Sequence, residues 1–402
     1  MEGQLDVFDF IERPTESVTL SSKIYTDEIT RGIESIFDYQ NDDGYVKEEI
    51  LIPKFPKEYQ IGLIVGSSGS GKSTLLRTSF AGADEQVVWD EQKAIASHFE
   101  SLEEASNRFG AVGLNSIPTW LKPYHALSNG EKFRADMARR LKDNAVIDEF
   151  TSVVNREVAI SCSVSIEKYI RRYGLKNITF ASCHDDIIPY LQPDWVYNTD
   201  SHEFFNGRYL CRPQIRINII SCGKQAWGMF RRHHYLSGEL NDASVCYLGV
   251  YNDIPIAFMA LLALPGKGLE HAWKEHRVVI LPDYQGMGIG NAFSEAIAQA
   301  YIDKGCRYFC KTSNPRMGEH RERSPKWRPT THNKSARRDY VNPDGTFRVR
   351  KKMTASLAKK HSGRVCYAHE YIGDGAKHEY DLNISQDRIK QCEGQMSIDM
   401  FL

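Results

Sequence analysis

Short apolar runs alternate with longer amphipathic stretches through the first half of the chain. EEILIP, IGLIVG, NAVIDEF and NITFASCH are brief, apolar and rich in β-branched residues, which predicts strands. GSSGSGKSTLLRTSF predicts a loop that runs into a helix, FRADMARRL predicts an amphipathic helix, and residues 91–120 are mostly helical in pattern. Strands that alternate with helices favour a parallel sheet with crossover connections. We therefore expect an α/β domain over residues 1–205.

The second half has a different pattern, which begins after a polar, turn-rich break at residues 200–212. CYLGVY and PIAFMALLAL predict paired strands around the turn YNDIP, and HRVVILP, CRYFCKTS and VCYAHEYIG predict further strands. A Gly-rich turn at 286–290 leads into a helix that we expect to stop at Gly305. The pattern predicts a second, α+β domain over 213–385 and a flexible tail over 386–402.

Composition narrows the class of protein. Formal net charge is −1, and no apolar run approaches the roughly 20 residues that span a bilayer. The acidic start MEGQLDVFDF does not resemble a signal peptide, so we expect a cytoplasmic protein. The nine cysteines include no CxxC pair or zinc spacing, and Cys306 and Cys310 are expected to be reduced thiols on a buried strand.

The sequence GSSGSGKS lies between a predicted strand and a predicted helix, where a phosphate-binding loop belongs. Its glycines allow backbone N–H groups to surround phosphates, and the helix N-terminus adds positive potential. Lys72 would reach the β- and γ-phosphates, and the Ser73 hydroxyl would bind Mg²⁺. The predicted ATP-binding residues here are Gly66, Ser67, Ser68, Gly69, Ser70, Gly71, Lys72, Ser73 and Thr74.

Four further segments follow in a fixed order: LSNGE at 127–131, VIDEF at 146–150, FTSVVNREVA at 150–159 and His184 after the strand ITFASC. With the Gly-rich loop, they resemble the signature, Walker B, D-loop and switch histidine of ABC ATPases. The resemblance covers residues 45–200. It implies a P-loop ABC ATPase domain that binds and hydrolyses ATP.

The resemblance also implies roles for single residues. Asp148 would hold Mg²⁺ with Ser73, Glu149 would be the general base for the attacking water, and His184 would contact the γ-phosphate. ABC cassettes enclose ATP between two copies, so an ATP-dependent homodimer is expected, with Ser128 and Gly130 acting across its interface. Taken singly, Asp148 and Glu149 could be an ordinary strand-end carboxylate pair, and His184 could be an ordinary loop histidine.

Some positions depart from the ABC pattern. Asn155 replaces the usual D-loop aspartate, and the segment between the Gly-rich loop and the signature is short. Gln92 is a weak match for the Q-loop glutamine and Tyr39 for the adenine-stacking aromatic. The shortened segment disfavours a subunit of a membrane transporter.

VVILPDYQGMGIGNAFSEAIAQAYID, residues 278–303, resembles the acyl-CoA motif of GNAT acyltransferases. Gln285, Gly286, Gly288 and Gly290 would place backbone donors against the pyrophosphate of acetyl-CoA or another acyl-CoA. A dinucleotide loop of GxGxxG type is the rival interpretation, but the third glycine and the later acidic residue are missing. A plain turn at the start of a helix is the other alternative.

RRHHYLSGEL, residues 231–240, lies upstream, where GNAT proteins place substrate-facing elements. His233, His234 and Tyr235 offer acid and base groups, with His234 and Tyr235 as the catalytic candidates. The same side chains could simply pack on a half-buried helix. This stretch and the strands after it resemble phage Mom-type proteins, which implies modification of adenine in DNA.

Residues 316–338 are rich in arginine and also contain Trp327 and His332. Arginines can bind phosphates and a tryptophan can stack on a base, so the stretch is a candidate DNA-binding surface. A solvated basic loop or a contact to the CoA 3′-phosphate would give the same composition.

The last residues, QMSIDMFL, resemble the peptide by which replication and repair proteins dock on sliding clamps. Gln395, Ile398, Met400 and Phe401 would be its anchors. A terminal strand is the alternative.

Together these features favour an ABC-type ATPase fused to an acyl-CoA-dependent transferase that modifies a DNA base amine. Two alternatives stay open: an ATP-regulated N-acyltransferase acting on protein or aminoacyl-tRNA, and a DNA-binding ABC ATPase with a non-catalytic GNAT-like module.

Overall fold

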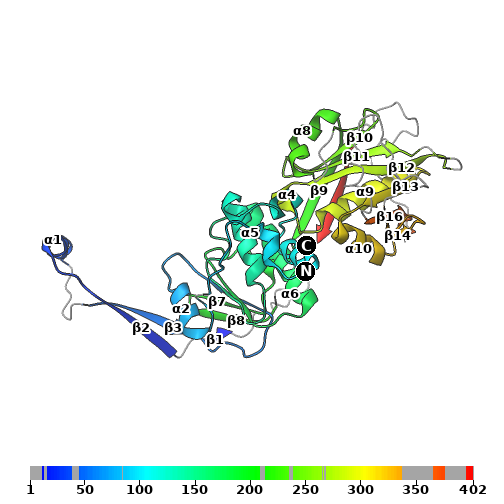
Figure 1. Ribbon diagram of the computed structural model, residues 1–402. Helices are drawn as coiled ribbons and strands as arrows, with labels where there is room; N and C mark the ends of the chain where they lie inside the picture. Colours follow the sequence, from blue (N-terminus) through cyan, green and yellow to red (C-terminus); the bar gives the residue numbers. More distant parts are fainter. Residues whose placement is uncertain are drawn as a thin grey trace. The chain divides into compact units, whose positions relative to one another are not determined.

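The computed structural model describes residues 11–12, 16–38, 45–83, 85–208, 213–234, 239–264, 266, 269–336, 365–375 and 395–401. The chain divides into two compact units, Met1–Pro213 and Gln214–Leu402 (Figure 1). Within the described residues, no helix is both long and apolar enough to cross a membrane.

The first unit contains a six-stranded sheet in the order β1-β8-β7-β4-β6-β5. β7, β4, β6 and β5 are parallel, while β8 is antiparallel to β7 and to β1. The strands span Ile11–Glu12 (β1), Ile61–Val65 (β4), Val146–Ile147 (β5), Ile178–Ser182 (β6), Trp195–Asn198 (β7) and Glu203–Asn206 (β8). The predicted parallel sheet is therefore present.

Helices flank this sheet, and their apolar side chains pack against the apolar side chains of the strands in two clusters. All five residues of β4 are buried, as expected for a parallel strand covered on both faces. Gly62 is required there, because a Cβ would lie 2.1 Å from the Trp195 ring. The helices are α2 (Lys72–Ser79), α3 (Leu102–Ala111), α4 (Ile117–Trp120), α5 (Asn129–Arg140), α6 (Arg156–Tyr173) and α7 (Ile188–Leu191), with 3₁₀ turns η1 (Ile95–His98) and η2 (Tyr124–Ala126).

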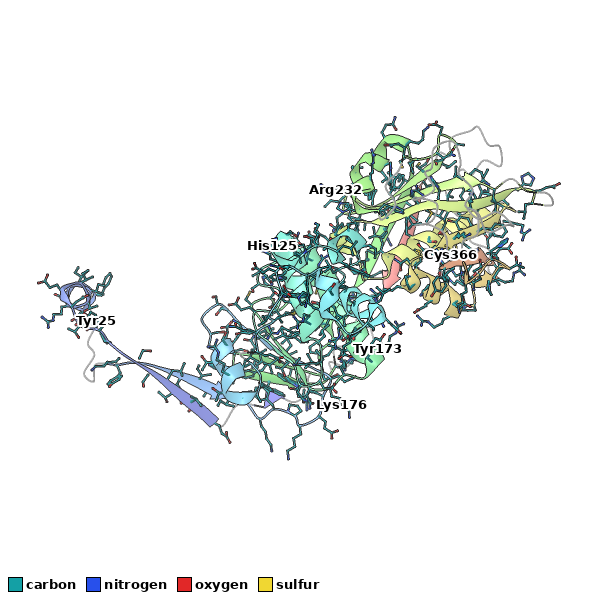
Figure 2. All side chains as sticks on the ribbon, viewed as in Figure 1. Tyr25, His125, Tyr173, Lys176, Arg232 and Cys366 are labelled. Carbon is teal, nitrogen blue, oxygen red and sulfur yellow. The ribbon has the colours of Figure 1, made fainter. Side chains whose placement is uncertain are left out.

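An antiparallel pair, β2 (Glu16–Lys23) and β3 (Tyr45–Ile52), forms a separate two-stranded ribbon (Figure 1). Between its strands the chain forms α1 (Glu28–Phe37), which Asp27 and Thr30 close with a reciprocal capping box. None of the α1 residues is buried. Tyr25, just before this helix, is also exposed (Figure 2).

The second unit contains a sheet in the order β14-β16-β13-β12-β11-β10-β9-β17, with β15 paired to β16. Neighbours are antiparallel except for β12 and β13, which are parallel. The strands span Gln214–Cys222 (β9), Val245–Tyr251 (β10), Ile254–Ala263 (β11), Ala272–Ile280 (β12), Arg307–Thr312 (β13), Trp327–Pro329 (β14), Ser335–Ala336 (β15), Val365–Tyr371 (β16) and Gln395–Phe401 (β17). This is the predicted α+β arrangement.

The turn predicted at YNDIP is a two-residue hairpin. Asn252 and Asp253 both have positive φ, 47° and 62°, which matches the right-handed twist of the paired strands β10 and β11. The helices of the unit are α8 (Trp227–Phe230), α9 (Ile289–Asp303) and α10 (Pro315–Arg323), with 3₁₀ turns η3 (Lys224–Ala226), η4 (Arg231–His233) and η5 (Pro282–Tyr284). Gly305, at φ 80°, lies directly after the end of α9 as predicted.

The C-terminal residues differ from the flexible tail that the sequence predicts. Gln395–Phe401 is strand β17, paired in antiparallel register with β9 from Gln395–Ile220 to Phe401–Gln214. The physical reason is that β9 would otherwise present an unpaired edge, which a spaced-aliphatic segment can complete. The side chains of the four clamp-binding candidates, Gln395, Ile398, Met400 and Phe401, lie outside the described residues.

Candidate functional site

Two helices differ from all the other long helices of the described chain in how they begin. α1, α3, α5, α6 and α10 start at Asp27, Ser101, Ser128, Asn155 and Asn314, each of which accepts a backbone N–H of the first turn. α2 and α9 start instead at Gly71 and Gly288, in left-handed conformation at φ 84° and 96°, with no side-chain cap. A helix start of this kind leaves backbone donors and the positive end of the dipole for a ligand.

The first of these turns is the Gly-rich loop 66–71 between β4 and α2. Gly66, Gly69 and Gly71 all have positive φ, and a Cβ on Gly66 would lie 2.0 Å from Thr199 Oγ1. A Cβ on Gly69 would meet nothing within 4 Å, so the loop is open on that side. Ser68 lies beside Gly69 and is exposed.

Polar contacts fix the shape of the loop. Ser70 Oγ donates to Ser67 O at 2.8 Å and lies 2.6 Å from Thr199 Oγ1. Lys72 Nζ donates to Gly66 O at 2.8 Å, so the ammonium of this first α2 residue lies over the Gly-rich loop that precedes the helix. Ser73 and Thr74 follow on the first turn of α2 and are partly exposed.

Asp200, from the turn after β7, also holds this loop. Its carboxylate accepts from the Ser67 backbone N–H at 2.7 Å and from the Ser67 hydroxyl at 2.8 Å. Hydrogen bonds from the Ser67 hydroxyl and backbone N–H lower the pKa of the Asp200 carboxyl. Burial raises this pKa and the charge of Lys72 lowers it further, so the net shift is downward. Sequence reasoning missed this residue because it lies 133 positions away in the chain.

Parallel pairing places the segments that resemble the Walker B motif and the switch histidine beside this loop. β6 lies between β4 and β5, so the carboxyl ends of all three strands share one edge of the sheet. Asp148 accepts from the Glu149 backbone N–H at 2.8 Å. Glu149 has φ 51° and an exposed side chain, a conformation that favours glycine and that is often retained at functional sites.

His184 lies at the end of the neighbouring strand. Its Nδ1 is 3.1 Å from Thr151 Oγ1, and its backbone N–H donates to Ser182 Oγ at 3.0 Å. Burial and then the charge of Arg156 lower the pKa of His184, so the ring is neutral at neutral pH. The structure thus brings Gly66–Ser73, Asp148, Glu149 and His184 to one sheet edge.

Mg²⁺ would suit the residues at this edge. The ion prefers oxygen ligands and keeps several waters, so one carboxylate and one hydroxyl suffice on the protein side. Asp148 and Ser73 are both partly exposed. The described residues contain no cluster of three or more His, Cys, Asp and Glu that could hold a metal alone.

The signature segment starts α5. Ser128 accepts from the Glu131 backbone N–H, and Glu131 accepts from the Ser128 backbone N–H at 2.9 Å, a reciprocal capping box. A Cβ on Gly130 would meet nothing within 4 Å, which leaves the first turn of α5 accessible. Asn155, at the D-loop aspartate position, caps α6 through the Val158 N–H at 2.9 Å.

The weaker ABC matches have no clear place at this edge. Gln92 is exposed in a turn, where its backbone N–H donates to Asp90 Oδ1 at 3.0 Å. Tyr39 lies outside the described residues.

The second uncapped turn lies between β12 and α9 in the second unit. Gly286 and Gly288 have φ 91° and 96°, and Gln285 Nε2 donates to Ile280 O at 2.8 Å, which ties the turn to the end of β12. Gly288 is exposed, and Gln285, Gly286 and Gly290 are partly exposed. The glycines of the turn are therefore not covered by side chains, whereas Met287 between them is buried.

β12 and β13 are paired at one end only. The register joins Ala272–Arg307, Trp273–Tyr308 and Lys274–Phe309 and then stops, although β12 continues to Ile280. Among the described residues, the backbone N–H and C=O groups of β12 beyond Lys274 consequently have no partner strand on that side. Such groups require another partner, and an extended ligand arm that carries amides can supply one.

Two charged residues are buried where α10 and α9 meet β12. Arg321 of α10 donates to both carboxylate oxygens of Glu275 at 3.0 Å and to Ser294 Oγ of α9 at 2.8 Å. The paired side chains are 1% and 7% exposed. The bidentate pair joins α10 and α9 to β12, and the arginine pattern of 316–338 gave no sign of this structural role.

The basic stretch contains two departures from the sequence-based expectation. Trp327 is 4% exposed, its Nε1 donates to Glu295 at 3.0 Å and its ring contacts Tyr371; the prediction that it stacks on a base is wrong, because the ring belongs to the core. Several cations of the stretch also pair with carboxylates, as Arg321–Glu275, Lys326–Glu295, Arg328–Glu370 and Lys334–Glu322.

The candidate catalytic residues upstream lie by α8. His234 follows η4, and its ring contacts the buried Trp227 at 5.8 Å, which is the packing role that the sequence left open. Arg232 stands beside it at the surface (Figure 2) and donates to His233 Nε2 at 2.9 Å. Tyr235 lies outside the described residues.

Comparison with known proteins adds to this geometry. Residues 214–321 match the model of the acetyltransferase (GNAT) family. No curated protein matches the chain.

Solved structures of two kinds are similar to parts of the chain. The ribosomal-protein-S18-alanine N-acetyltransferase from Escherichia coli is 17% identical, with 40% of this chain and 99% of that one covered and a TM-score of 0.28. A Bacillus subtilis acetyltransferase in complex with CoA is 11% identical, with 39% and 97% covered and a TM-score of 0.27.

A dimeric bacterial ABC transporter cassette is 14% identical, with 40% of this chain and 89% of that one covered and a TM-score of 0.30.

The match to the GNAT family model falls on the strands β9 to β13 and on the uncapped turn before α9. Residues 214–321 therefore form a GNAT acetyltransferase domain.

Proposed function

We propose that the chain is an acyl-CoA-dependent N-acetyltransferase joined to an ATP-hydrolysing cassette of ABC type. The observation that carries the proposal is the pair of uncapped glycine helix starts, one in each unit, at Gly71 and Gly288. Each follows a sheet strand and leaves backbone donors available, as phosphate-binding turns do.

In the second unit, the turn at 285–290 would bind the CoA pyrophosphate. β12 separates from β13 beyond Lys274, so the pantetheine amides can pair with the backbone of β12. This arrangement would direct the thioester toward the middle of the sheet, where the two strands part.

The transfer step then follows from ordinary acyl chemistry. The acceptor amine nitrogen attacks the thioester carbonyl carbon, a C–N bond forms and the C–S bond breaks. The amine loses a proton and the thiol leaves as CoA. His234 and Tyr235 remain our predicted acid and base groups near this step, although His234 contacts Trp227.

In the first unit, Lys72 and the loop N–H groups would hold the ATP phosphates, and Ser73 and Asp148 would hold Mg²⁺. Glu149, exposed at the strand end, would take the proton of the attacking water. His184 is neutral and can donate from its ring to the γ-phosphate.

The acceptor that we would test first is a nucleobase amine in DNA. Its support is the sequence resemblance of residues 231–240 and their flanks to Mom-type proteins. The described part of 316–338 contributes less than its composition suggests, because four of its cations pair with carboxylates. Docking on a sliding clamp through 395–401 would require β17 to leave β9.

The experiment is a transfer assay with [¹⁴C]acetyl-CoA and the full-length protein, run with duplex DNA, single-stranded DNA, tRNA and a protein lysate as separate acceptors, each with and without ATP. Label in DNA, with a matching mass increase in the digested nucleosides, supports a base amine. Label in tRNA or in protein would indicate that the acceptor amine belongs to that class of molecule and not to DNA. Absence of label from every acceptor contradicts the proposed transferase.

A further inference from the structure

His276 occupies an irregular position on β12. Opposite it on β11, Ala260 is in register with Arg277 and Leu261 with Glu275, so His276 is the extra residue of a β-bulge and has no Cα partner. A bulge turns its side chain away from the regular alternation, and bulges are frequent next to active sites.

The same residue lies just past the point where β13 leaves β12. Pairing of the two strands ends at Lys274–Phe309, two positions before His276. From His276 to Ile280, where Gln285 ties down the Gly-rich turn, β12 covers about 13 Å at about 3.3 Å per residue. An extended pantetheine arm with its pyrophosphate on that turn is long enough to bring its thioester beside His276.

The ring of His276 has one engaged and one unengaged nitrogen. Nδ1 lies 3.4 Å from Arg277 Nη1. Nε2 is buried and has no hydrogen-bond partner among the residues that the structure describes. A buried polar atom left without a partner costs about 1–3 kcal/mol, so a partner supplied by a ligand would be favourable.

The neighbouring guanidinium indicates which nitrogen carries the proton. A guanidinium has donors only, so Nδ1 must be the acceptor in this contact and the proton of the neutral ring is on Nε2. Burial, then the charges of Arg277 and Lys274, lower the pKa of His276 to about 4, so the ring is neutral at neutral pH. The buried nitrogen is therefore an N–H donor.

We propose that the Nε2–H of His276 donates a hydrogen bond to the thioester carbonyl oxygen of the bound acyl-CoA. The inference rests on the proposed transferase function. As the amine nitrogen attacks, the C=O π electrons move to that oxygen, and the hydrogen bond strengthens because the oxygen gains negative charge. They return to the carbonyl when the C–S bond breaks and the sulfur leaves with the electrons of that bond. His276 keeps its proton throughout.

The test is nuclear magnetic resonance of the full-length protein with ¹⁵N in its histidine rings. The His276 signals are assigned by their loss in His276→Gln. At neutral pH we expect a protonated Nε2 and an unprotonated Nδ1, and we expect acetyl-CoA to shift the Nε2–H signal much more than CoA, which lacks the carbonyl. A protonated Nδ1, or equal shifts with both ligands, overturns the role of His276.

Calorimetry on the same samples separates this inference from the proposed function. If acetyl-CoA binds but its shift at His276 equals that of CoA, the transferase stands and the His276 contact is wrong. If acetyl-CoA does not bind at all, both fall.

Variants give a second measurement. We expect the wild type to prefer acetyl-CoA over CoA by roughly three- to tenfold, the scale of one hydrogen bond. His276→Leu should abolish this preference, while His276→Gln, which retains an amide N–H, should keep part of it. A preference that survives in His276→Leu contradicts the contact.

Discussion

At the scale of single residues, the half-buried carboxylate of Asp194 is held by several partners at once. Asp194, before β7, accepts from the backbone N–H groups of Gln60 and Ile61 at 2.8 and 3.0 Å. It also forms two hydrogen bonds with the guanidinium of Arg171 at 2.9 and 2.8 Å. One carboxylate thus joins α6 to the start of β4, the strand that leads to the Gly-rich loop.

Asp194 gives a prediction about stability and pH. Burial raises its pKa, but the hydrogen bonds from Arg171, Ile61 and Gln60 outweigh burial, and the pKa is lowered from 3.8. A lowered carboxyl pKa contributes stability above the unfolded value, and this contribution is lost as the pH falls through the folded value. Asp194→Asn should cost about 1.5–3 kcal/mol at pH 7, and the difference from wild type should shrink below about pH 4.

Urea unfolding of wild type and Asp194→Asn at several pH values measures this. Glu91→Gln is the control, because Glu91 is an exposed carboxylate. A difference that stays constant down to pH 3 would argue against the carboxylate as its source.

Lys72 and Glu149 give a prediction about ATP turnover. Lys72→Ala should abolish ATP binding, since the ammonium, which lies within 2.8 Å of Gly66 O, is our proposed phosphate contact. Glu149→Gln should bind ATP as wild type does and hydrolyse it about 100- to 10,000-fold more slowly, the usual contribution of a general base. Phosphate release and fluorescent-nucleotide binding measure the two effects; equal hydrolysis by Glu149→Gln and wild type would remove the base role.

Residue patterns in the sequence predicted the two Gly-rich turns and the carboxylates at 148–149. They could not predict Asp200 or Arg321, because each acts on a partner far along the chain, Ser67 and Glu275. Nor could they predict that Trp327 is buried. A tryptophan among arginines gives the same sequence pattern whether its ring lies on the surface or packs into the core.

At the scale of elements, local chemistry decides which helix starts are closed. Ser128 and Asn155 follow the rule that short polar residues cap helices, so the segments that resemble the signature and D-loop also stabilise α5 and α6. Glycine at the starts of α2 and α9 gives up that stabilisation. Apolar runs predicted most strands because strand formation also depends on neighbouring residues. The bulge at His276 could not be predicted in this way, because it depends on the register with β11.

Strand β17 gives a prediction at this scale. Removal of residues 395–402 would leave β9 as an unpaired edge next to the buried side chains of Ile215, Ile217 and Ile219. We expect a lower melting temperature for the second unit and concentration-dependent association.

Differential scanning calorimetry and light scattering test this, with loss of Leu402 alone as the control because that residue lies beyond β17. An unchanged melting temperature in the longer truncation would show that 395–401 does not complete the sheet in solution.

At the scale of the whole molecule, each unit has its own sheet and its own uncapped turn. Because the motifs of the first unit resemble those of ABC ATPases, we propose that two chains close around ATP, with Ser128 and Gly130 facing the partner's nucleotide. The accessible first turn of α5 is compatible with this arrangement.

Dimerisation should therefore depend on ATP. In Glu149→Gln, which should retain ATP, we expect the molar mass from light scattering to double when Mg-ATP is added. Lys72→Ala should remain monomeric under the same conditions. A Glu149→Gln protein that stays monomeric at saturating ATP would count against the shared site.

The central claim is that one chain carries two independent phosphate-binding turns, and calorimetric titration of the full-length protein with ATP and with acetyl-CoA tests it most directly. Lys72→Ala should lose ATP and keep acetyl-CoA, and Gly288→Ala should do the reverse. Gly305→Ala, with a similar positive φ at the far end of α9, should bind both ligands. Failure of the wild type to bind either ligand, or loss of both in one variant that stays folded, would contradict the account.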